Sequence, residues 1–488
     1  MSSPLLELEP RLLWKHFDLI RRMPRPSKHE EKVVEAILAW AKEHGYEVRR
    51  DSVGNIVVAV PATPGHEDAP VVVLQGHVDM VCEKNSDVEH DFMNDPIDVV
   101  VDGDWVKARG TTLGADNGIG VAAAMAIADD PDAVHGPLEL LFTIDEETGL
   151  TGAMGLDPSI VKGEIMLNLD TEEDGAVYIG CAGGADSTAT FSLERRTAGA
   201  GTEPFRLAVT GLRGGHSGVD IHENRANAIK LAVRTLLRAI ENGVELELVS
   251  LEGGSKHNAI PREAFAVFRI PGEARETLEE TVAKATGDFL QEFGSIDPDL
   301  KLAVEPLTDE AAYQRPVVDT DRDRLLHALN GLPHGVMAMS RDVPGLVETS
   351  NNVAVITTGE DEAVLTTSHR SSVMPSLYAV QSQVRSVCLL AGAEVEVHDA
   401  YPGWKPNPDS PIVKKTVEVY ERLFGTTPEL KAIHAGLECG LLIEKKPGMD
   451  VVSIGPEIKN AHSPDEMVQI SSVKKFYEHL KAVLADLA

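Results

Sequence analysis

The sequence predicts an α/β protein whose mostly parallel sheet is flanked by helices and interrupted by a second, α+β domain. Short apolar, β-branched runs alternate with helical patterns up to residue 184. Amphipathic strands and helices follow from residue 185 to 399, and the first pattern then resumes. We therefore expect a main domain formed by residues 1–184 and 400–488, with residues 185–399 inserted into it.

Composition narrows the class of protein. The chain has 488 residues, so two or more domains are expected. Its 45 basic and 78 acidic residues give a net charge of −33, which disfavours nucleic acid and anionic membranes as partners. No secretory signal and no membrane-spanning run is visible, and the four cysteines form no CxxC pair. We expect a cytoplasmic protein without a cysteine-built zinc site.

The N-terminal elements follow from apolar spacing. Residues 10–24 show a helical pattern that is ended by prolines. Ser27 and Glu30 have the spacing of a capping box, which predicts that a second helix begins there. Two strands are expected next, at residues 46–50 and 55–60.

The central strand of the main domain is expected within residues 71–81, an apolar run that ends near a glycine. His77 and Asp79 lie at its carboxyl end, where open α/β sheets place their active sites. On an extended backbone they face the same way, and a carboxylate beside an imidazole fixes the tautomer of a metal-binding histidine. Taken alone, such a pair is more typical of a solvated loop.

A glycine-rich turn precedes the next helix. Residues 82–112 are expected to form a long polar connection, and residues 111–120 lead into a helix of small residues at 121–128. Glycine-rich turns before helices often bind phosphate, but no lysine follows here and Asp116 lies in the turn. Asp116 is therefore either a helix cap or a metal ligand.

Two further buried strands end in carboxylates. Residues 138–144 are followed by Asp145–Glu147, and residues 165–169 are followed by Asp170. Adjacent carboxylates repel one another unless a cation holds them, although an exposed acidic turn is an equally simple explanation.

The remaining elements are expected from the same patterns. The inserted domain has predicted strands at 205–210, 264–270, 353–358 and 363–367 and predicted helices at 226–241, 278–293 and 380–390. The C-terminal part has a predicted helix at 411–424, a strand at 450–454, a loop that carries His462 and a helix at 472–487.

Together these strand and turn ends supply a possible set of metal ligands: His77, Asp116, Glu146 or Glu147, Asp170 and His462. Nitrogen and oxygen ligands of this kind suit Zn²⁺, Co²⁺ or Mn²⁺. Five ligands are too many for one catalytic zinc ion, which keeps an open position. Shared between two ions, with one carboxylate bridging them, the number is reasonable.

The order of short motifs resembles the M20 family of di-zinc exopeptidases, and within it the aminoacyl-histidine dipeptidases, also called cytosolic non-specific dipeptidases or peptidase D. The resemblance covers nearly the whole chain. The motifs are GHVDMV (76–81), KARGTTLGADNGIG (107–120), DEETG (145–149), NLDTEE (168–173), GCAGG (180–184), GLRGGHSG (211–218), HNAIPREAF (257–265), AYPGW (400–404), HAGLECG (434–440), SIGP (453–456) and HSPDE (462–466).

The resemblance implies a zinc-exopeptidase type of catalytic domain and a role for each candidate ligand. Asp116 would bridge two ions, and the Asp116–Asn117 peptide would be cis. The other ligands would be His77 and Asp170 at one ion and Glu147 and His462 at the other. Asp79 would orient His77. Glu146 would be the general base that takes a proton from the water between the ions, since a metal-bound carboxylate is a poor base.

The resemblance also makes the inserted domain a lid and dimerisation domain. His216 would stabilise the oxyanion, in its own chain or across a dimer, although a lone histidine in a glycine-rich loop is more often plain surface. Arg370 and Asn258 would bind the carboxylate end and backbone of the substrate. For Arg370, a surface salt bridge is an equally simple explanation. Gly436 and Glu438 would line the opposite end, with Glu438 near a free amino terminus.

We therefore expect a cytoplasmic, homodimeric metallopeptidase with two divalent ions per chain, most readily Zn²⁺. It would hydrolyse unblocked dipeptides with broad tolerance, including Xaa-His. One alternative is a deacylase that removes an acyl group from an amino acid and needs no free amine. Another is a catalytically silent metal-binding homologue, which is disfavoured because position 146 still carries a glutamate.

Overall fold

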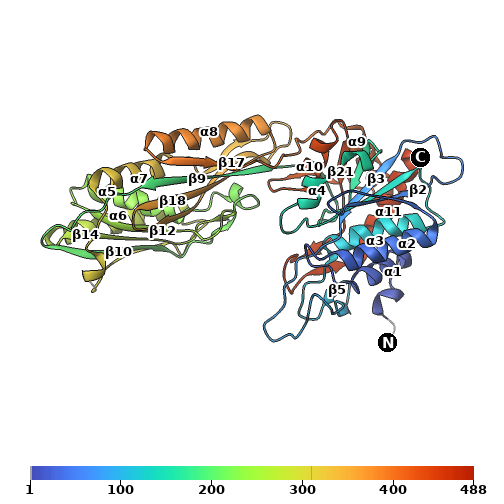
Figure 1. Ribbon diagram of the computed structural model, residues 1–488, viewed down its shortest axis with the longest axis horizontal. Coiled ribbons are helices and arrows are strands. Elements are labelled where there is room, and N and C mark those ends of the chain that lie inside the picture. Colours follow the sequence, from blue (N-terminus) through green and yellow to red (C-terminus); the bar gives the residue numbers. More distant parts are fainter. Residues whose placement is uncertain (1–2, 309) are drawn as a thin grey trace. The chain divides into compact units, whose positions relative to one another are not determined.

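The computed structural model describes residues 3–308 and 310–488 (Figure 1). The chain forms two compact units. The first unit contains Met1–Gly180, Pro406–Ala432 and Leu437–Ala488, and the second contains Cys181–Lys405 and Ile433–Gly436. Within the described ranges, no helix has both the length and the apolar character needed to cross a membrane.

The first unit is built on an eight-stranded sheet in the order β1-β2-β6-β3-β7-β21-β8-β20. The central strands β6, β3, β7 and β21 run parallel, while β1 and β2 on one side and β8 on the other are antiparallel to their neighbours. The strands are β1 (Glu47–Arg50), β2 (Ile56–Val60), β3 (Val72–His77), β6 (Leu138–Thr143), β7 (Ile165–Asn168), β8 (Ala176–Cys181), β20 (Glu429–Ile433) and β21 (Asp450–Ser453). The predicted α/β sheet is confirmed.

The helices of the first unit are α1 (Arg11–Ile20), α2 (Glu31–His44), α3 (Ala115–Asp129), α4 (Thr151–Gly155), α9 (Pro411–Phe424), α10 (Glu438–Lys445) and α11 (Ile470–Leu487). Helix α3 packs between β3 and α1, and its small residues are buried almost all round. A side chain at Gly120 would lie 2.5 Å from the backbone oxygen of Leu169. The small residues therefore let the helix that begins beside Asp116 approach the sheet closely.

Two local predictions in this unit are wrong. The predicted capping box of Ser27 and Glu30 is absent: helix α2 begins at Glu31 and has no side-chain cap. The Glu30 carboxylate accepts hydrogen bonds from the backbone N–H groups of Lys28 and Asp145. The Ser27 hydroxyl donates instead to Asp79.

The predicted polar connection at 82–112 also contains two strands. They are β4 (Val99–Asp102) and β5 (Trp105–Ala108), which join β22 (Ile458–Lys459) and β23 (Met467–Gln469) in a four-stranded sheet. β4 and β5 pair with each other as a hairpin with Gly103 in its turn, which is a local signal that the prediction overlooked. Only the pairing of β5 with β23 joins segments far apart in the sequence.

The second unit is an antiparallel sheet in the order β15-β10-β14-β12-β17-β18-β9-β19, with β16 paired to β17. Its strands are β9 (Gly183–Ser192), β10 (Thr202–Thr210), β12 (Glu247–Gly253), β14 (Ala264–Pro271), β15 (Lys301–Pro306), β16 (Gly335–Met339), β17 (Val347–Thr358), β18 (Glu362–Ser371) and β19 (Glu394–Val397). The short strands β11 (Gly215–His216) and β13 (Ala259–Ile260) pair with each other.

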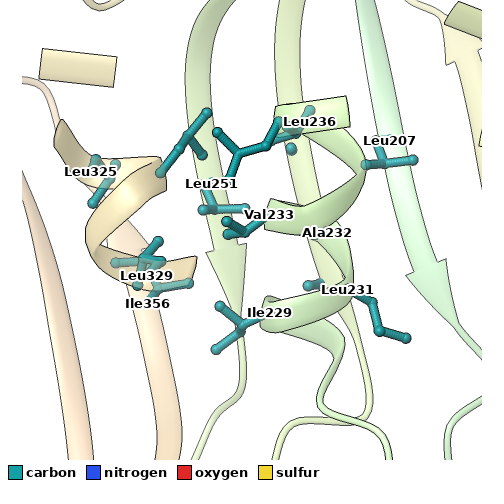
Figure 2. Packing of buried hydrophobic residues seen from close by; sticks show 14 of the residues in the cluster. Leu207, Ile229, Leu231, Ala232, Val233, Leu236, Leu251, Leu325, Leu329 and Ile356 are labelled. Atoms are coloured by element: carbon teal, nitrogen blue, oxygen red, sulfur yellow. The ribbon is translucent and has the colours of Figure 1, made fainter. Parts of the chain in front are cut away.

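Its helices are α5 (Ala228–Glu241), α6 (Arg275–Phe293), α7 (Asp319–Gly331) and α8 (Met374–Leu390). Figure 2 shows how apolar side chains of α5 and α7 meet those of the sheet: Leu207, Ile229, Leu231, Ala232, Val233, Leu236, Leu251, Leu325, Leu329 and Ile356. This core fixes the sheet that carries the polar residues described below, and the predicted α+β character of this part is confirmed.

Candidate metal centre

The candidate site lies at the carboxyl ends of three adjacent parallel strands. His77 is the last residue of β3, Glu147 follows β6 and Asp170 follows β7. Asp116 lies in the first turn of α3, which packs on β3, and His462 lies in the turn between β22 and β23. Because neighbouring parallel strands end at the same edge of the sheet, their terminal side chains converge there.

These five residues form two groups that share Asp116. The ligand atoms of His77, Asp116 and Asp170 all lie within 4.8 Å of one another, and so do those of Asp116, Glu147 and His462. Asp116 Oδ1 lies 3.1 Å from Nε2 of His77, and its Oδ2 lies 3.1 Å from Nε2 of His462. The Asp116–Asn117 peptide is cis, as the resemblance implied. Each oxygen of one carboxylate thus faces a different histidine.

The donor set fits divalent cations. Within the described residues, Glu147 Oε1 is buried and accepts no hydrogen bond, and the buried Asp170 Oδ1 has only a long approach of 3.4 Å to Nε2 of His77. A buried anionic oxygen without a donor is costly, and a cation removes that cost. Burial, opposed by His77, raises the pKa of Asp170 to about 6. A bound cation would favour its charged form.

Asp79 contacts His77 at Nδ1, the ring nitrogen that does not face Asp116. The carboxylate is buried, and its Oδ1 lies 3.2 Å from Nδ1 of His77. It also accepts hydrogen bonds from the Ser27 hydroxyl at 2.7 Å and from the backbone N–H groups of Glu146 and Glu147 at 3.1 Å each. Burial alone would raise its pKa, but the hydrogen bonds prevail and lower it to about 2. Asp79 is therefore an anion that holds both His77 and the turn after β6.

The three successive carboxylates after β6 point to different surroundings. Asp145 is buried with Glu30, and its oxygens accept hydrogen bonds from the hydroxyls of Thr148 and Thr151. Glu147 belongs to the second ligand group. Glu146 lies outside both groups that share Asp116 but forms a third possible group with His77 and Glu147, and burial raises its pKa well above the ordinary value. A carboxylate in that position is suited to accept a proton.

Glu438 lies at the start of α10 and is fully buried. Its Oε2 accepts hydrogen bonds from Gln75 at 2.7 Å and from Thr143 at 2.6 Å, while Oε1 has no hydrogen-bond partner in the described part of the chain. Burial raises the pKa of its carboxyl to about 7. Its proposed contact with a substrate amine stays a prediction.

The other predicted residues lie together in the second unit. Nδ1 of His216 accepts hydrogen bonds from the backbone N–H groups of Gly218 and Val219 at 3.2 and 3.0 Å, so its proton is on Nε2. Burial, together with Arg370, lowers the pKa of His216 to about 4. His216 is therefore a neutral donor at neutral pH. The backbone oxygen of Asn258 accepts a hydrogen bond from Ser217 at 2.8 Å.

Arg370 is buried in β18 and donates to the hydroxyls of Ser217 at 3.4 Å and Tyr401 at 3.1 Å. Because Arg370 is buried, and these hydrogen bonds go to hydroxyls, the surface salt bridge considered above is wrong. A side chain at Gly436 would lie 3.0 Å from the Tyr401 ring. A buried guanidinium without a carboxylate partner is suited to bind an external one.

Sequence reasoning missed two residues at the metal centre, Arg25 and Glu466. The guanidinium of Arg25 is buried and donates to the backbone oxygens of Val78, Asp79 and Gly114. Glu466 binds the turn before Asp116. Both act on backbone groups, which carry no residue signature. The only signal was that Glu466 closes the HSPDE motif.

Comparison with known proteins identifies the family to which the chain belongs. The fold and the paired ligand groups define a candidate metallohydrolase. The chain belongs to peptidase family M20/M25/M40, whose family model matches residues 73–486, and it is therefore an enzyme of a metal-dependent peptidase family.

Two full-length relatives are close. The chain is 44% identical over 485 residues to the cytosol non-specific dipeptidase of Escherichia coli (strain K12), covering 99% of both chains. The solved structure of aminoacylhistidine dipeptidase from Vibrio alginolyticus has 46% identity and a TM-score of 0.92, covering 99% of this chain and 98% of the other. Aminopeptidase PepT from Bacillus cereus shares only the fold, with 15% identity and a TM-score of 0.58 over 98% and 99% of the two chains.

Proposed function

We propose that this protein is a metal-dependent dipeptidase that hydrolyses unblocked dipeptides with broad side-chain tolerance, including Xaa-His. The observation that carries the proposal is the pair of ligand groups that share Asp116, with Glu146 beside them. The names of the two full-length relatives support the substrate class. The proposal includes a cytoplasmic location and a homodimer.

Each ligand group would hold one divalent ion, most readily Zn²⁺, with Co²⁺ or Mn²⁺ as alternatives. His77 and Asp170 would complete one site, and Glu147 and His462 the other, with Asp116 shared. Ions bound there would polarise the scissile carbonyl and lower the pKa of a water molecule between them.

The chain's own groups would then move the proton. Glu146 would accept it from the attacking water and deliver it to the nitrogen of the leaving amine. Asp79 would keep Nε2 of His77 turned toward the ligand group by holding Nδ1. The backbone N–H groups of Glu146 and Glu147 donate to Asp79, which would keep the positions of the base and of the neighbouring ligand fixed relative to each other.

The second unit would act as a lid that grips the peptide. Nε2–H of His216 would donate to the developing oxyanion, and Arg370, with Asn258 nearby, would bind the substrate's free carboxylate. Gly436 and Glu438 would line the end that receives the free amine.

The test is hydrolysis of Ala-His, Gly-Leu and N-acetyl-Ala by metal-stripped protein, with and without Zn²⁺, Co²⁺ or Mn²⁺. Metal-restored cleavage of the two dipeptides alone is the expected result. Cleavage of N-acetyl-Ala alone would identify a deacylase and remove the amine role of Glu438. Inactivity on all three, unchanged in Glu146→Ala, would favour the silent homologue.

Substitution of His216 by Ala is expected to lower kcat by roughly 10²–10³-fold, as for loss of one oxyanion donor, while leaving metal content unchanged. His222→Ala is the matched control, because His222 is exposed in the same loop. Steady-state kinetics on Ala-His with metal analysis would check this. A kcat equal to that of His222→Ala would remove His216 from the mechanism.

Substitution of Arg370 by Lys is expected to raise KM for free dipeptides by about tenfold or more, because a point charge cannot replace a bidentate donor. Dipeptide amides, which lack the free carboxylate, should be poor substrates for the wild type and the variant alike. The ratio of activity on free dipeptides to activity on their amides should therefore be smaller for the variant than for the wild type. Arg234→Lys is the control, since Arg234 pairs with Glu292 on the surface of the same unit. A preserved preference would contradict the assignment.

A further inference from the structure

Glu466 makes an unusual set of contacts for a residue outside the ligand groups. Its buried carboxylate accepts hydrogen bonds from four successive backbone N–H groups. Oε2 accepts from Leu113 at 2.7 Å and Gly114 at 2.9 Å, and Oε1 accepts from Ala115 at 2.7 Å and Asp116 at 3.3 Å. Both oxygens are thus used to hold the turn that delivers Asp116.

A carboxylate at the start of a helix is by itself an ordinary cap. Glu466 differs because it is 350 residues away from Asp116 and belongs to the turn that carries His462. Its own N–H donates to the backbone oxygen of Ser463 at 3.0 Å, and the Ser463 hydroxyl donates to that of Asn460 at 2.8 Å. The turn is therefore closed internally and tied to the Asp116 turn through one side chain.

His462 needs such a tie more than the other predicted ligands. Its side chain is 55% exposed, so packing does little to hold it. Its φ of +62° lies in the left-handed region, which is uncommon for a residue other than glycine and costs free energy unless the surroundings compensate. The position of His462 relative to Asp116 therefore depends on the turn that Glu466 anchors.

The Asp116 turn is held from its other side by Arg25, whose guanidinium donates to the backbone oxygen of Gly114. Gly114 itself has a φ of +69°, and a Cβ there would overlap with the Arg25 side chain. The carbonyl and N–H groups of this turn are thus bound by two buried side chains of opposite charge.

We propose that Glu466 is a positioning residue that couples Asp116 to His462 and thereby sets the affinity of the Asp116–Glu147–His462 group for its ion. This inference rests on the proposed two-ion function. It assigns to Glu466 no contact with metal or substrate.

Substitution of Glu466 by Gln tests the idea with little change in size. One oxygen becomes an amide NH₂, so two of the four backbone N–H groups would face a donor instead of an acceptor. The ion of the His462 group should bind roughly 10–100-fold more weakly, as when outer partners of metal ligands are removed. The ion of the His77 group should change less, because Glu466 supports that group only through Asp116, whereas it supports both Asp116 and the turn of His462 in the other group.

The matched control is Glu139→Gln. Glu139 is also buried in the first unit, and its carboxylate accepts backbone hydrogen bonds from Lys162 at 2.8 Å and Gly163 at 3.0 Å. This variant should lose folding stability without losing metal affinity. It separates the proposed role of Glu466 from a general loss of stability.

The experiment is calorimetric titration of metal-stripped full-length protein with Zn²⁺, together with visible absorption spectra after titration with Co²⁺. Glu466→Gln should show one weakened binding step and an altered Co²⁺ spectrum. In a His462→Ala background, the same substitution should have little further effect, and Glu466→Asp, which keeps both oxygens, should recover part of the affinity.

Wild-type affinity for both ions in Glu466→Gln would overturn the inference, and so would a loss no larger than in Glu139→Gln. If the wild type bound a single ion, the two-ion proposal would fail separately. The coupling by Glu466 would then be judged by whether Glu466→Gln weakens that ion more than Glu139→Gln does.

Discussion

Replacement of Glu146 by Gln is expected to leave both metal ions bound and to lower kcat for Ala-His by roughly 10²–10⁴-fold, the usual range for loss of a general base. Gln keeps the size of the side chain but cannot accept the proton. Glu146 lies outside the two groups that share Asp116, although its carboxylate also forms a third possible group with His77 and Glu147. The proposal assigns ions only to the two groups that share Asp116, so the charge of Glu146 is not expected to hold an ion. Metal analysis and steady-state kinetics on the same preparation would check both halves of this expectation.

The matched variant is Glu147→Gln, which changes the adjacent residue in the same way. Glu147 Oε2 lies 3.1 Å from Nε2 of His462, and its Oε1 is buried without a hydrogen-bond donor from the described part of the chain. This variant should lose the ion of the His462 group as well as activity. If Glu146→Gln lost an ion while Glu147→Gln kept both, the assignment of ligand and base to these neighbours would be reversed.

The sheet was predictable because its strands carry their own signal. β3, β6 and β7 are apolar runs bounded by glycine or carboxylate, and burial on both faces of a central parallel strand demands such a composition. His77 ends β3, and Glu147 and Asp170 follow shortly after β6 and β7. Because these strands are parallel neighbours, the three residues lie at the same edge of the sheet.

The sequence could not show which role each of several adjacent carboxylates has. Asp145, Glu146 and Glu147 are adjacent carboxylates, yet Asp145 is tied to threonine hydroxyls while Glu147 joins a ligand group. The turn after β6, not the residue type, decides which way each side chain points. The resemblance to a known family supplied that division.

Long-range contacts to backbone groups were equally out of reach. Ser27 was predicted to cap α2, but its hydroxyl donates to Asp79, because the tertiary partner outcompetes the local one. Arg25 and Glu466 bind backbone atoms of segments distant in the sequence. Any residue could supply those backbone atoms, so no pattern in their sequence marks them as partners.

Substitution of Asp116 by Ala is expected to remove both ions and to reduce hydrolysis to background. Asp116 is the one residue common to the two ligand groups, and its two oxygens face His77 and His462 at 3.1 Å each. Its loss would leave each group with a single carboxylate and a single histidine, too few for a tight site. His77→Ala and His462→Ala, which each remove one ligand from one group, should each weaken mainly one ion.

Metal content after gel filtration, followed by Zn²⁺ titration of the three variants, would test this shared role. We expect Asp116→Ala to lose two ions and each histidine variant to lose one. The thermal stability of the metal-stripped proteins should be compared to show that all three variants fold. One ion retained at wild-type affinity in Asp116→Ala would mean that Asp116 serves a single site. The bridged arrangement would then be wrong, because a carboxylate that links two ions cannot be removed without affecting both.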